Sequence, residues 1–261
     1  MGCGWLGKAL GKALLEKGYK VKGSTTSTNK LENLSKQGIT PFLIQLYESG
    51  IEGNIDELLS DLDVLIVNVP PNLRRQPQSN YVAKMQWLLK ACIKAKVSNI
   101  LFVSSTSVYG ALEGEITEAV PPQPKTKSGK QLLKAEQLFL KESTLSVSII
   151  RFGGLIGEDR HPINQLSGKT LKNGEDLVNL IHQKDCIHMI LTIIENGYWN
   201  ELFNGVYPYH PTKAEYYTSE AKKRGLPAPI YLTPSENVNK KKISFKNFYV
   251  KGHDLTTSIF S

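Results

Sequence analysis

The sequence predicts an α/β fold in which a doubly wound parallel sheet is covered by helices on both faces. Two observations predict it. Strand-like and helix-like segments alternate over residues 1–152, and a glycine-rich turn near the amino terminus runs straight into an amphipathic helix. Beyond residue 152 the alternation loosens. We therefore expect one domain over residues 1–152 and a small α+β lobe over 153–261, packed on the first domain and partly interleaved with it.

The glycine-rich turn has the pattern Gly-x-Gly-x-x-Gly, which is typical of a dinucleotide-binding loop. The first glycine permits a tight turn, the second lets the backbone approach a pyrophosphate, and the third lets the helix pack closely on its strand. The N–H groups at the start of the helix then hold the anion. The predicted cofactor contacts in this turn are Gly2, Gly4, Trp5, Leu6 and Gly7.

The helix after the turn carries Leu6, Leu10 and Leu14 on one face. In such a fold a buried parallel strand precedes the first glycine, and only Met1 stands there. We therefore expect the first strand to be missing from this chain and the natural protein to begin upstream with a short apolar strand. The absence of this strand should cost more free energy than the ~5–15 kcal/mol by which a typical domain is stable. The alternatives are that residues 41–46 shift into the gap or that the chain folds poorly.

The other elements follow from apolar runs and helical spacing bounded by glycine and proline. In the first domain we expect strands at 19–23, 41–46, 63–69, 100–103 and 146–152, and a helix at 80–95. In the lobe we expect strands at 176–182 and 203–206, and helices at 186–195 and 213–224.

The composition of the 261 residues restricts the function classes. The net charge of +8 comes from lysines spread along the chain, which favours a solvated surface over a nucleic-acid-binding one. No apolar run approaches the ~20 residues of a membrane span. Three widely spaced cysteines indicate a reducing cytoplasm, and five histidines without ligand spacing indicate no metal site. We expect a cytoplasmic protein with no nucleic-acid or membrane partner.

A second motif, Ser-Ser-Thr-Ser-Val-Tyr-Gly over residues 104–110, follows the strand expected at 100–103. With the glycine turn, Arg151 in the stretch IIRFGGLIG and the later NLIHQKD segment, it resembles the extended short-chain dehydrogenase/reductase superfamily, in its NAD-dependent epimerase/dehydratase branch. The resemblance covers nearly the whole chain. It implies a Rossmann-like sheet, an NAD(P) cofactor and a C-terminal lobe that receives the substrate, which in this branch is typified by nucleotide sugars.

The resemblance implies that Ser105 polarises the substrate oxygen. The family's acid/base is a Tyr-x-x-x-Lys pair on the next helix, in which the lysine lowers the pKa of the tyrosine and holds the nicotinamide ribose. The family glutamate that comes four residues after the lysine matches Glu136, which places Ser128 at the tyrosine and Leu132 at the lysine. A serine hydroxyl is a poor acid/base at neutral pH.

A slipped register would pair Thr126 with Lys130, which restores the lysine but not the phenol. No tyrosine lies between Tyr109 and Tyr198, so the chain is an atypical member that lacks the pair. Tyr109 is a candidate substitute acid, although packing is the alternative role. The candidate catalytic residues are Ser105, Tyr109 and Ser128.

The substrate candidates are Ser105, Arg151 and Arg160. Arg151 could bind a substrate anion or pair with a buried carboxylate. Arg160 and His161, on the Gly157-Glu158-Asp159 loop, could contact a substrate phosphate or remain solvated. Near the start of the helix expected at 186–195, we expect Asp185 to act as a helix cap.

The second strand lacks the acidic residue that would bind the adenosine ribose of NAD. Small hydroxyls and a lysine follow it instead, which favours NADP over NAD, with a solvated loop as the alternative. The predicted contacts here are Ser24, Thr25, Thr26 and Lys30, and Val69, Pro70 and Ser104 complete the predicted cofactor site.

The sequence thus predicts an NAD(P)-binding oxidoreductase or isomerase with a degenerate catalytic set, acting on a small molecule that could be anionic and resemble a nucleotide sugar. The alternative is a non-catalytic module that senses NADP(H) or a nucleotide. A nucleic-acid binder is a third hypothesis, for which no recognition motif is found. The oligomeric state is left open between monomer and homodimer.

Overall fold

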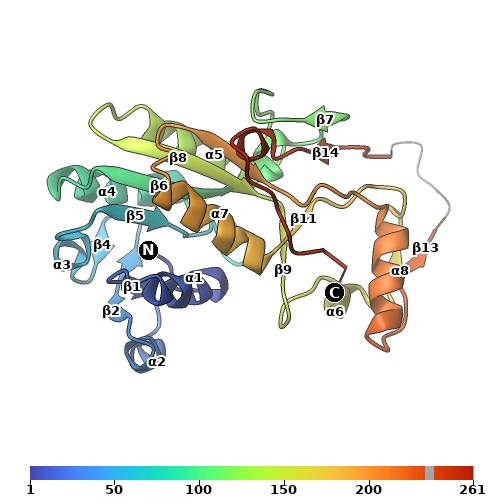
Figure 1. The fold of residues 1–261 in the computed structure, drawn as a ribbon, viewed down its shortest axis with the longest axis horizontal. Helices are drawn as coiled ribbons and strands as arrows, with labels where there is room; N and C mark the ends of the chain where they lie inside the picture. Colours follow the sequence, from blue (N-terminus) through green and yellow to red (C-terminus); the bar gives the residue numbers. More distant parts are fainter. Residues whose placement is uncertain (233–237, 261) are drawn as a thin grey trace.

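The computed structural model describes residues 1–232 and 238–260, and its main sheet consists of four parallel strands. The spatial order is β5, β6, β8, β12, with β6 bonded to β5 on one side and β8 on the other. This mixed α/β architecture confirms the predicted fold class (Figure 1). The strands are β5 (Val64–Val67), β6 (Asn99–Ser105), β8 (Ser146–Phe152) and β12 (Leu202–Gly205).

Two further strands, β1 (Lys22–Thr25) and β2 (Thr40–Leu43), form a separate parallel pair. The expected strand at 19–23 was therefore placed three residues too early, because the ladder begins only where Lys22 meets Thr40. The expected strand at 41–46 divides into β2 and β3 (Gln45–Leu46). It divides because Ile44 bonds back to Thr25 and β3 turns into an antiparallel pair with β4 (Ile51–Glu52).

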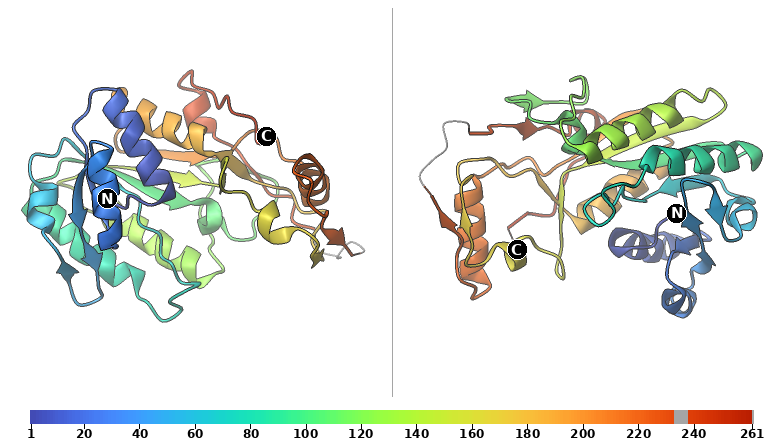
Figure 2. Two further views of the ribbon diagram at one scale, coloured as in Figure 1. Left: turned by 90° about the horizontal axis from the view of Figure 1, so that it is seen from below. Right: turned by 180° about the vertical axis from the view of Figure 1, so that it is seen from behind.

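Helices cover both faces of the sheet (Figure 2). The apolar sides of α1 (Trp5–Glu16) and α7 (Gln183–Glu195) pack together in one core layer. On the other face α4 (Tyr81–Lys94) and α5 (Lys127–Leu140) form a second layer. Shorter elements are η1 (Thr28–Lys30), α2 (Leu31–Lys36), α3 (Ile55–Leu59), η2 (Thr106–Tyr109) and α9 (Lys246–Tyr249).

The lobe lies at one end of the molecule, beyond the carboxyl ends of the main strands (Figure 1). It contains β9 (Gly154–Ile156), α6 (Ile163–Leu166), β10 (Thr170–Leu171), β11 (Leu180–His182), α8 (Lys213–Lys223) and β13 (Ile230–Tyr231). A parallel pair of β7 (Glu115–Ile116) and β14 (Lys242–Ile243) lies nearby. Because α7 and β12 return to the layers of the main sheet, residues beyond 152 interleave with those before it.

The strand expected at 176–182 is limited to its last three residues. Asp176 is instead held in a loop, where its carboxylate accepts from the Nζ of Lys213 at 2.9 Å and from the backbone N–H of Asn239 at 2.9 Å. Among residues 1–232 and 238–260, no helix has the length and apolarity needed to cross a membrane.

Candidate functional site

The candidate site lies at the edge where the main parallel strands end and α1 begins. Because parallel strands share a direction, the segments after β5 and β6 emerge at one edge of the sheet. Val69 and Pro70 follow β5, and the carbonyl of Val69 accepts from the Tyr81 hydroxyl at 2.8 Å. Ser104 and Ser105 close β6. The structure thus brings the predicted post-strand segments to the same edge.

The three glycines of the turn have different structural needs. Gly2 has a φ of +91°, and a Cβ there would collide with the backbone oxygen of Asn68. A Cβ on Gly7 would collide with the oxygen of Gly2, so packing alone requires the first and third glycines. A Cβ on Gly4 would meet nothing within 4 Å. The second glycine therefore faces open space, where a ligand can approach the backbone.

The N-terminus of α1 is free to bind an anion. Gly4 is its N-cap and provides no side-chain hydrogen bond, and the first turn contains no acidic residue. The N–H groups at the start of a helix lack partners within it and carry the positive end of the helix dipole. The open space beside Gly4 and these N–H groups together fit a dinucleotide pyrophosphate.

The cofactor contacts predicted at the end of β1 and just after it divide into two pairs. Ser24 and Thr25 are buried, and their hydroxyls accept from the N–H groups of Gly2 at 3.0 Å and Ser27 at 3.2 Å. The Ser24 hydroxyl therefore supports the glycine turn, whereas the Thr25 hydroxyl supports the backbone just after β1. Thr26 and Lys30 are exposed, so their side chains can reach a ligand.

The loop over residues 157–160 reaches the glycine turn from the lobe. The indole Nε1 of Trp5 donates to Asp159 Oδ1 at 2.6 Å, and the Arg160 guanidinium lies 5.0 Å from the centre of the Trp5 ring. This cation–π contact places the exposed Arg160 beside the first turn of α1. Its charge is therefore available next to the predicted pyrophosphate position.

A buried polar network lies under the site. Arg151 Nη2 pairs with Glu136 Oε2 at 2.6 Å, and the side chains of both residues are at most 4% exposed. Ser104 donates to the same carboxylate, and Arg151 Nη1 donates to the Tyr109 hydroxyl at 3.0 Å. That hydroxyl donates to Asn204 Oδ1 at 2.9 Å. The sequence left two partners open for Arg151, a substrate anion and a buried carboxylate. In the structure its partner is the buried carboxylate of Glu136.

The hydroxyl of Tyr109 is held inside this buried network by Arg151 and Asn204. The side chain is fully buried, and burial raises its pKa although the neighbouring Arg151 opposes the shift. A raised pKa moves the phenol away from the neutral range in which an acid/base works best. Burial and bonding thus favour the packing role that the sequence left open for Tyr109.

The helix α5 brings its first turn against η2. Gly129 makes the close approach possible, because a Cβ there would lie 2.8 Å from the carbonyl oxygen of Ser107. Ser128 is half-buried in this turn, and the Ser105 hydroxyl accepts from the Ser107 N–H at 3.2 Å. Ser128 and Ser105 are thus carried on two elements in contact.

The other α5 residues that the sequence matched to the family's tyrosine–lysine pair are Leu132, Thr126 and Lys130. Leu132, 4% exposed, is part of the hydrophobic core between the sheet and the α4/α5 layer. Thr126, from the slipped register, is the N-cap of α5 and accepts from the Gly129 N–H at 3.0 Å. Lys130 is exposed.

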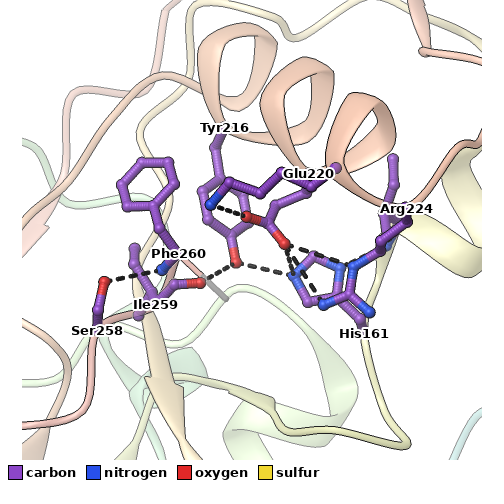
Figure 3. Close-up of polar contacts among 9 residues, drawn as sticks. His161, Tyr216, Glu220, Arg224, Ser258, Ile259 and Phe260 are labelled. Atoms are coloured by element: carbon purple, nitrogen blue, oxygen red, sulfur yellow. Dashed lines mark hydrogen bonds and ion pairs between the residues drawn. The ribbon is translucent and has the colours of Figure 1, made fainter.

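His161 lies in a second polar cluster in the lobe, whose other members the sequence did not indicate (Figure 3). The expectation that His161 could remain solvated is wrong, because it is 5% exposed. His161 Nε2 lies 2.8 Å from the Tyr216 hydroxyl, which donates to the carbonyl of Ile259 at 2.9 Å. Glu220, on the same helix as Tyr216, forms an ion pair with Arg224, the C-cap of that helix, beside this histidine. Burial lowers the pKa of His161 to about 4. The cluster joins residues some 40 to 100 positions apart, which no local pattern signals.

The expected helix cap by Asp185 is wrong. His182 caps α7, with its side chain accepting from the Lys184 N–H at 3.2 Å. Asp185 is 1% exposed and accepts from the N–H groups of Thr256 at 3.2 Å and Thr257 at 3.0 Å. The carboxylate thus anchors the C-terminal segment, a partner some 70 residues away.

Comparison with known proteins agrees with this geometry. Residues 2–196 match the family described as NAD(P)H-binding. The chain is 33% identical over 233 residues to Protein YeeZ of Escherichia coli strain K12, covering 88% of this chain and 85% of that protein. It is 24% identical to a sterol-4-alpha-carboxylate 3-dehydrogenase, decarboxylating, of Dictyostelium discoideum, covering 98% and 86%. The structure of UDP-glucuronic acid 4-epimerase from Bacillus cereus, in complex with UDP-glucuronic acid and NAD, superposes with a TM-score of 0.80 at 20% identity, covering 98% and 92%.

Proposed function

Because the chain belongs to the NAD(P)H-binding family, we propose that it is an NADP(H)-dependent oxidoreductase or isomerase of the epimerase/dehydratase type, a branch of the extended short-chain dehydrogenases/reductases. The observation that carries the proposal is the open space over Gly4 at an uncapped helix start. Packing explains the first and third glycines, whereas a Cβ on the second would meet no protein atom, which leaves room for a ligand beside the backbone. The three free thiols, Cys3, Cys92 and Cys186, support a reducing cytoplasm.

The residues that would hold the dinucleotide lie around the glycine turn. The N–H groups of Trp5 and Leu6 would bind the pyrophosphate, and Arg160 would add a positive charge beside it. When bound, the nicotinamide supplies or accepts a hydride at a substrate carbon. The exposed side chains of Thr26 and Lys30 suit a 2′-phosphate, which supports the preference for NADP.

The chain's own residues would orient the substrate more than they would move its protons. We propose that the Ser105 hydroxyl polarises a substrate oxygen and that Ser128 occupies the position of the family tyrosine. Because neither hydroxyl is a good acid/base near pH 7, proton transfer should lose the ~10²–10⁴-fold that a placed acid/base gives. We expect little turnover of simple alcohols, ketones or common nucleotide sugars.

A second function is favoured by one specific observation. Leu132, at the position matched to the family lysine, contributes to the hydrophobic core rather than presenting a charge. A chain that keeps the glycine turn but lacks the tyrosine–lysine pair could bind NADP(H) without catalysing a reaction, as a module that senses the dinucleotide. Its lobe would then respond to the bound dinucleotide instead of receiving a substrate.

Calorimetric titration with NADPH and NADH tests the cofactor proposal. We expect NADPH to bind at least as tightly as NADH, and Lys30→Ala to weaken NADPH binding several-fold while leaving NADH unchanged. Lys36→Ala is the matched control, because Lys36 is exposed and pairs with Glu32 on α2. A clear NADH preference, or equal effects of both substitutions, would contradict the assignment. Turnover of UDP-sugars at ordinary enzyme rates would contradict the degenerate catalytic set.

A further inference from the structure

The lobe approaches the glycine turn with a tight turn of its own, which is formed by residues 157–160 and is here called the lobe turn. The Gly157 N–H donates to the carbonyl of Arg160 at 2.8 Å, and the Arg160 N–H donates back to the carbonyl of Gly157 at 3.2 Å. Gly157 lies against Trp5, because a Cβ on Gly157 would come within 2.8 Å of the indole ring. The lobe turn is therefore compact, and it packs directly on the first residue of α1.

A pair of strands in the lobe directs this turn toward α1. The strands β9 and β11 are parallel, and their last residues, Ile156 and His182, pair with each other. The next residues along the two segments, Gly157 and Gln183, therefore emerge side by side. Gln183 Nε2 donates to the carbonyl of Trp5 at 3.1 Å. Trp5 is thus held both by the lobe turn and by the start of α7.

The residue after the lobe turn, His161, is fixed by a chain of hydrogen bonds with one direction (Figure 3). The Ile163 N–H donates to His161 Nδ1 at 3.2 Å, so the proton of the neutral ring lies on Nε2. That nitrogen donates to the Tyr216 hydroxyl at 2.8 Å, and the hydroxyl donates to the carbonyl of Ile259 at 2.9 Å. Because His161 and Tyr216 are buried, loss of one bond would leave a polar group unsatisfied in the core of the lobe.

The C-terminal segment, residues 255–260, joins this chain of bonds to α7. Its residues Leu255 and Ile259 are buried. Near its start the segment is bonded to the buried carboxylate of Asp185 on α7 through two N–H groups, and near its end Ile259 accepts from Tyr216. The segment therefore connects the two elements that hold Trp5, which are α7 and, through His161, the lobe turn.

The lobe turn carries charges of both signs, and its anchoring decides where each one lies. The Trp5 indole N–H donates to Asp159 at 2.6 Å, while the Arg160 guanidinium lies over the ring of the same indole. The remaining charge, Glu158, lies 3.7 Å from Lys184 Nζ on α7. Both carboxylates are therefore engaged by other groups. The positive charge of the turn is left beside the start of α1, where an anion is favoured.

We propose that His161 is a positioning residue for the dinucleotide. Held by Tyr216 and the C-terminal segment, it fixes the lobe turn against Trp5 and so sets the Arg160 guanidinium beside the pyrophosphate before the cofactor arrives. Such preorganisation raises affinity because less order has to be created on binding. The inference rests on the proposed dinucleotide function and deepens it. Order in the lobe is linked to affinity at the glycine turn, and by reciprocity the bound dinucleotide stabilises the lobe.

A double-mutant cycle on NADPH affinity tests the proposal by calorimetry. We expect Arg160→Ala to weaken NADPH binding about tenfold and Tyr216→Phe, which removes the hydroxyl but keeps the ring, to weaken it about three- to fivefold. The double variant should bind no more weakly than Arg160→Ala alone, because Tyr216 acts through Arg160. Tyr217→Phe is the matched control and should bind as the parent does. Tyr217 lies beside Tyr216 on α8 and is 7% exposed, and within the described residues its hydroxyl bonds to neither His161 nor Ile259.

Hydrogen exchange in the chain without dinucleotide measures the anchoring by itself. The Gly157 amide, which closes the lobe turn, should exchange more than about threefold faster in Tyr216→Phe than in Tyr217→Phe. His161→Asn offers a second route, since its side chain keeps an acceptor for the Ile163 N–H and loses the bond to Tyr216. It should give the same effects, and it replaces Tyr216→Phe in the cycle if that variant does not fold.

The outcomes separate this inference from the proposed function. Affinity losses that add in the double variant would overturn the inference alone, because Tyr216 would then act by another route. Equal affinities, or equal Gly157 exchange, for Tyr216→Phe and Tyr217→Phe would do the same. A parent chain that binds neither NADPH nor NADH would overturn the proposed function, and the positioning role of His161 with it.

Discussion

Replacing Glu136 with alanine removes the acceptor at the centre of the buried network. Arg151 would lose its ion pair, and the Ser104 hydroxyl would lose its acceptor. Because both charged side chains are at most 4% exposed, the guanidinium would remain buried without a counter-charge. Breaking a buried pair on one side costs about 3–5 kcal/mol of unfolding free energy. For a chain of this size we expect Tm to fall by roughly 10 °C.

Thermal and urea unfolding of matched variants checks this magnitude. Asp56→Ala is the control, because it breaks the exposed pair of Lys94 and Asp56, whose atoms lie 2.8 Å apart with side chains 71% and 62% exposed. Its loss should stay below about 1 kcal/mol. The double variant Glu136→Leu/Arg151→Met should recover most of the stability, because apolar residues can replace a buried pair. Equal losses for Glu136→Ala and Asp56→Ala would refute the reasoning.

Two further predictions concern other buried groups. Tyr109→Phe should cost about 1–3 kcal/mol of stability, because Arg151 and Asn204 lose a shared hydroxyl. It should leave NADPH affinity unchanged, and a loss of affinity by calorimetry without a loss of Tm would contradict the packing role. His161 is held neutral, with its pKa lowered to about 4, so the unfolded chain binds its proton first as pH falls. Its stabilising contribution is complete above the ordinary pKa and should decline by about 2 kcal/mol between pH 7 and pH 5. Urea unfolding at both pH values should show His161→Asn to be less pH-dependent than the parent by that amount, and an equal dependence would contradict the lowered pKa.

Local patterns predicted the elements whose structure is decided locally. The apolar stripe of Leu6, Leu10 and Leu14 predicted α1, and the largely apolar, β-branched segment over residues 146–152 predicted β8. The edges were less accurate where a distant partner decides them. β1 begins at Lys22 because its partner strand β2 begins at Thr40, the residue that pairs with Lys22.

The candidate site was predictable only in part, for the same reason. The glycine pattern locates the turn, because its spacing is itself a local signal. Which hydroxyls face a ligand depends on neighbours far along the chain, as Ser24 shows by bonding to Gly2. The partners of Asp185 and His161 come from the C-terminal segment and α8. Such contacts leave no periodic signal in the sequence.

The most direct measurement of the central claim is NADPH binding by Gly4→Val beside the parent chain. A Cβ at Gly4 meets nothing within 4 Å, and the residue is not in a left-handed conformation, so the fold should tolerate the substitution. We predict a Tm within about 2 °C of the parent and a loss of NADPH affinity of at least about a hundredfold, because the added methyl groups occupy the space of the pyrophosphate. Unchanged affinity in a folded Gly4→Val variant would contradict the claim that this turn binds the dinucleotide.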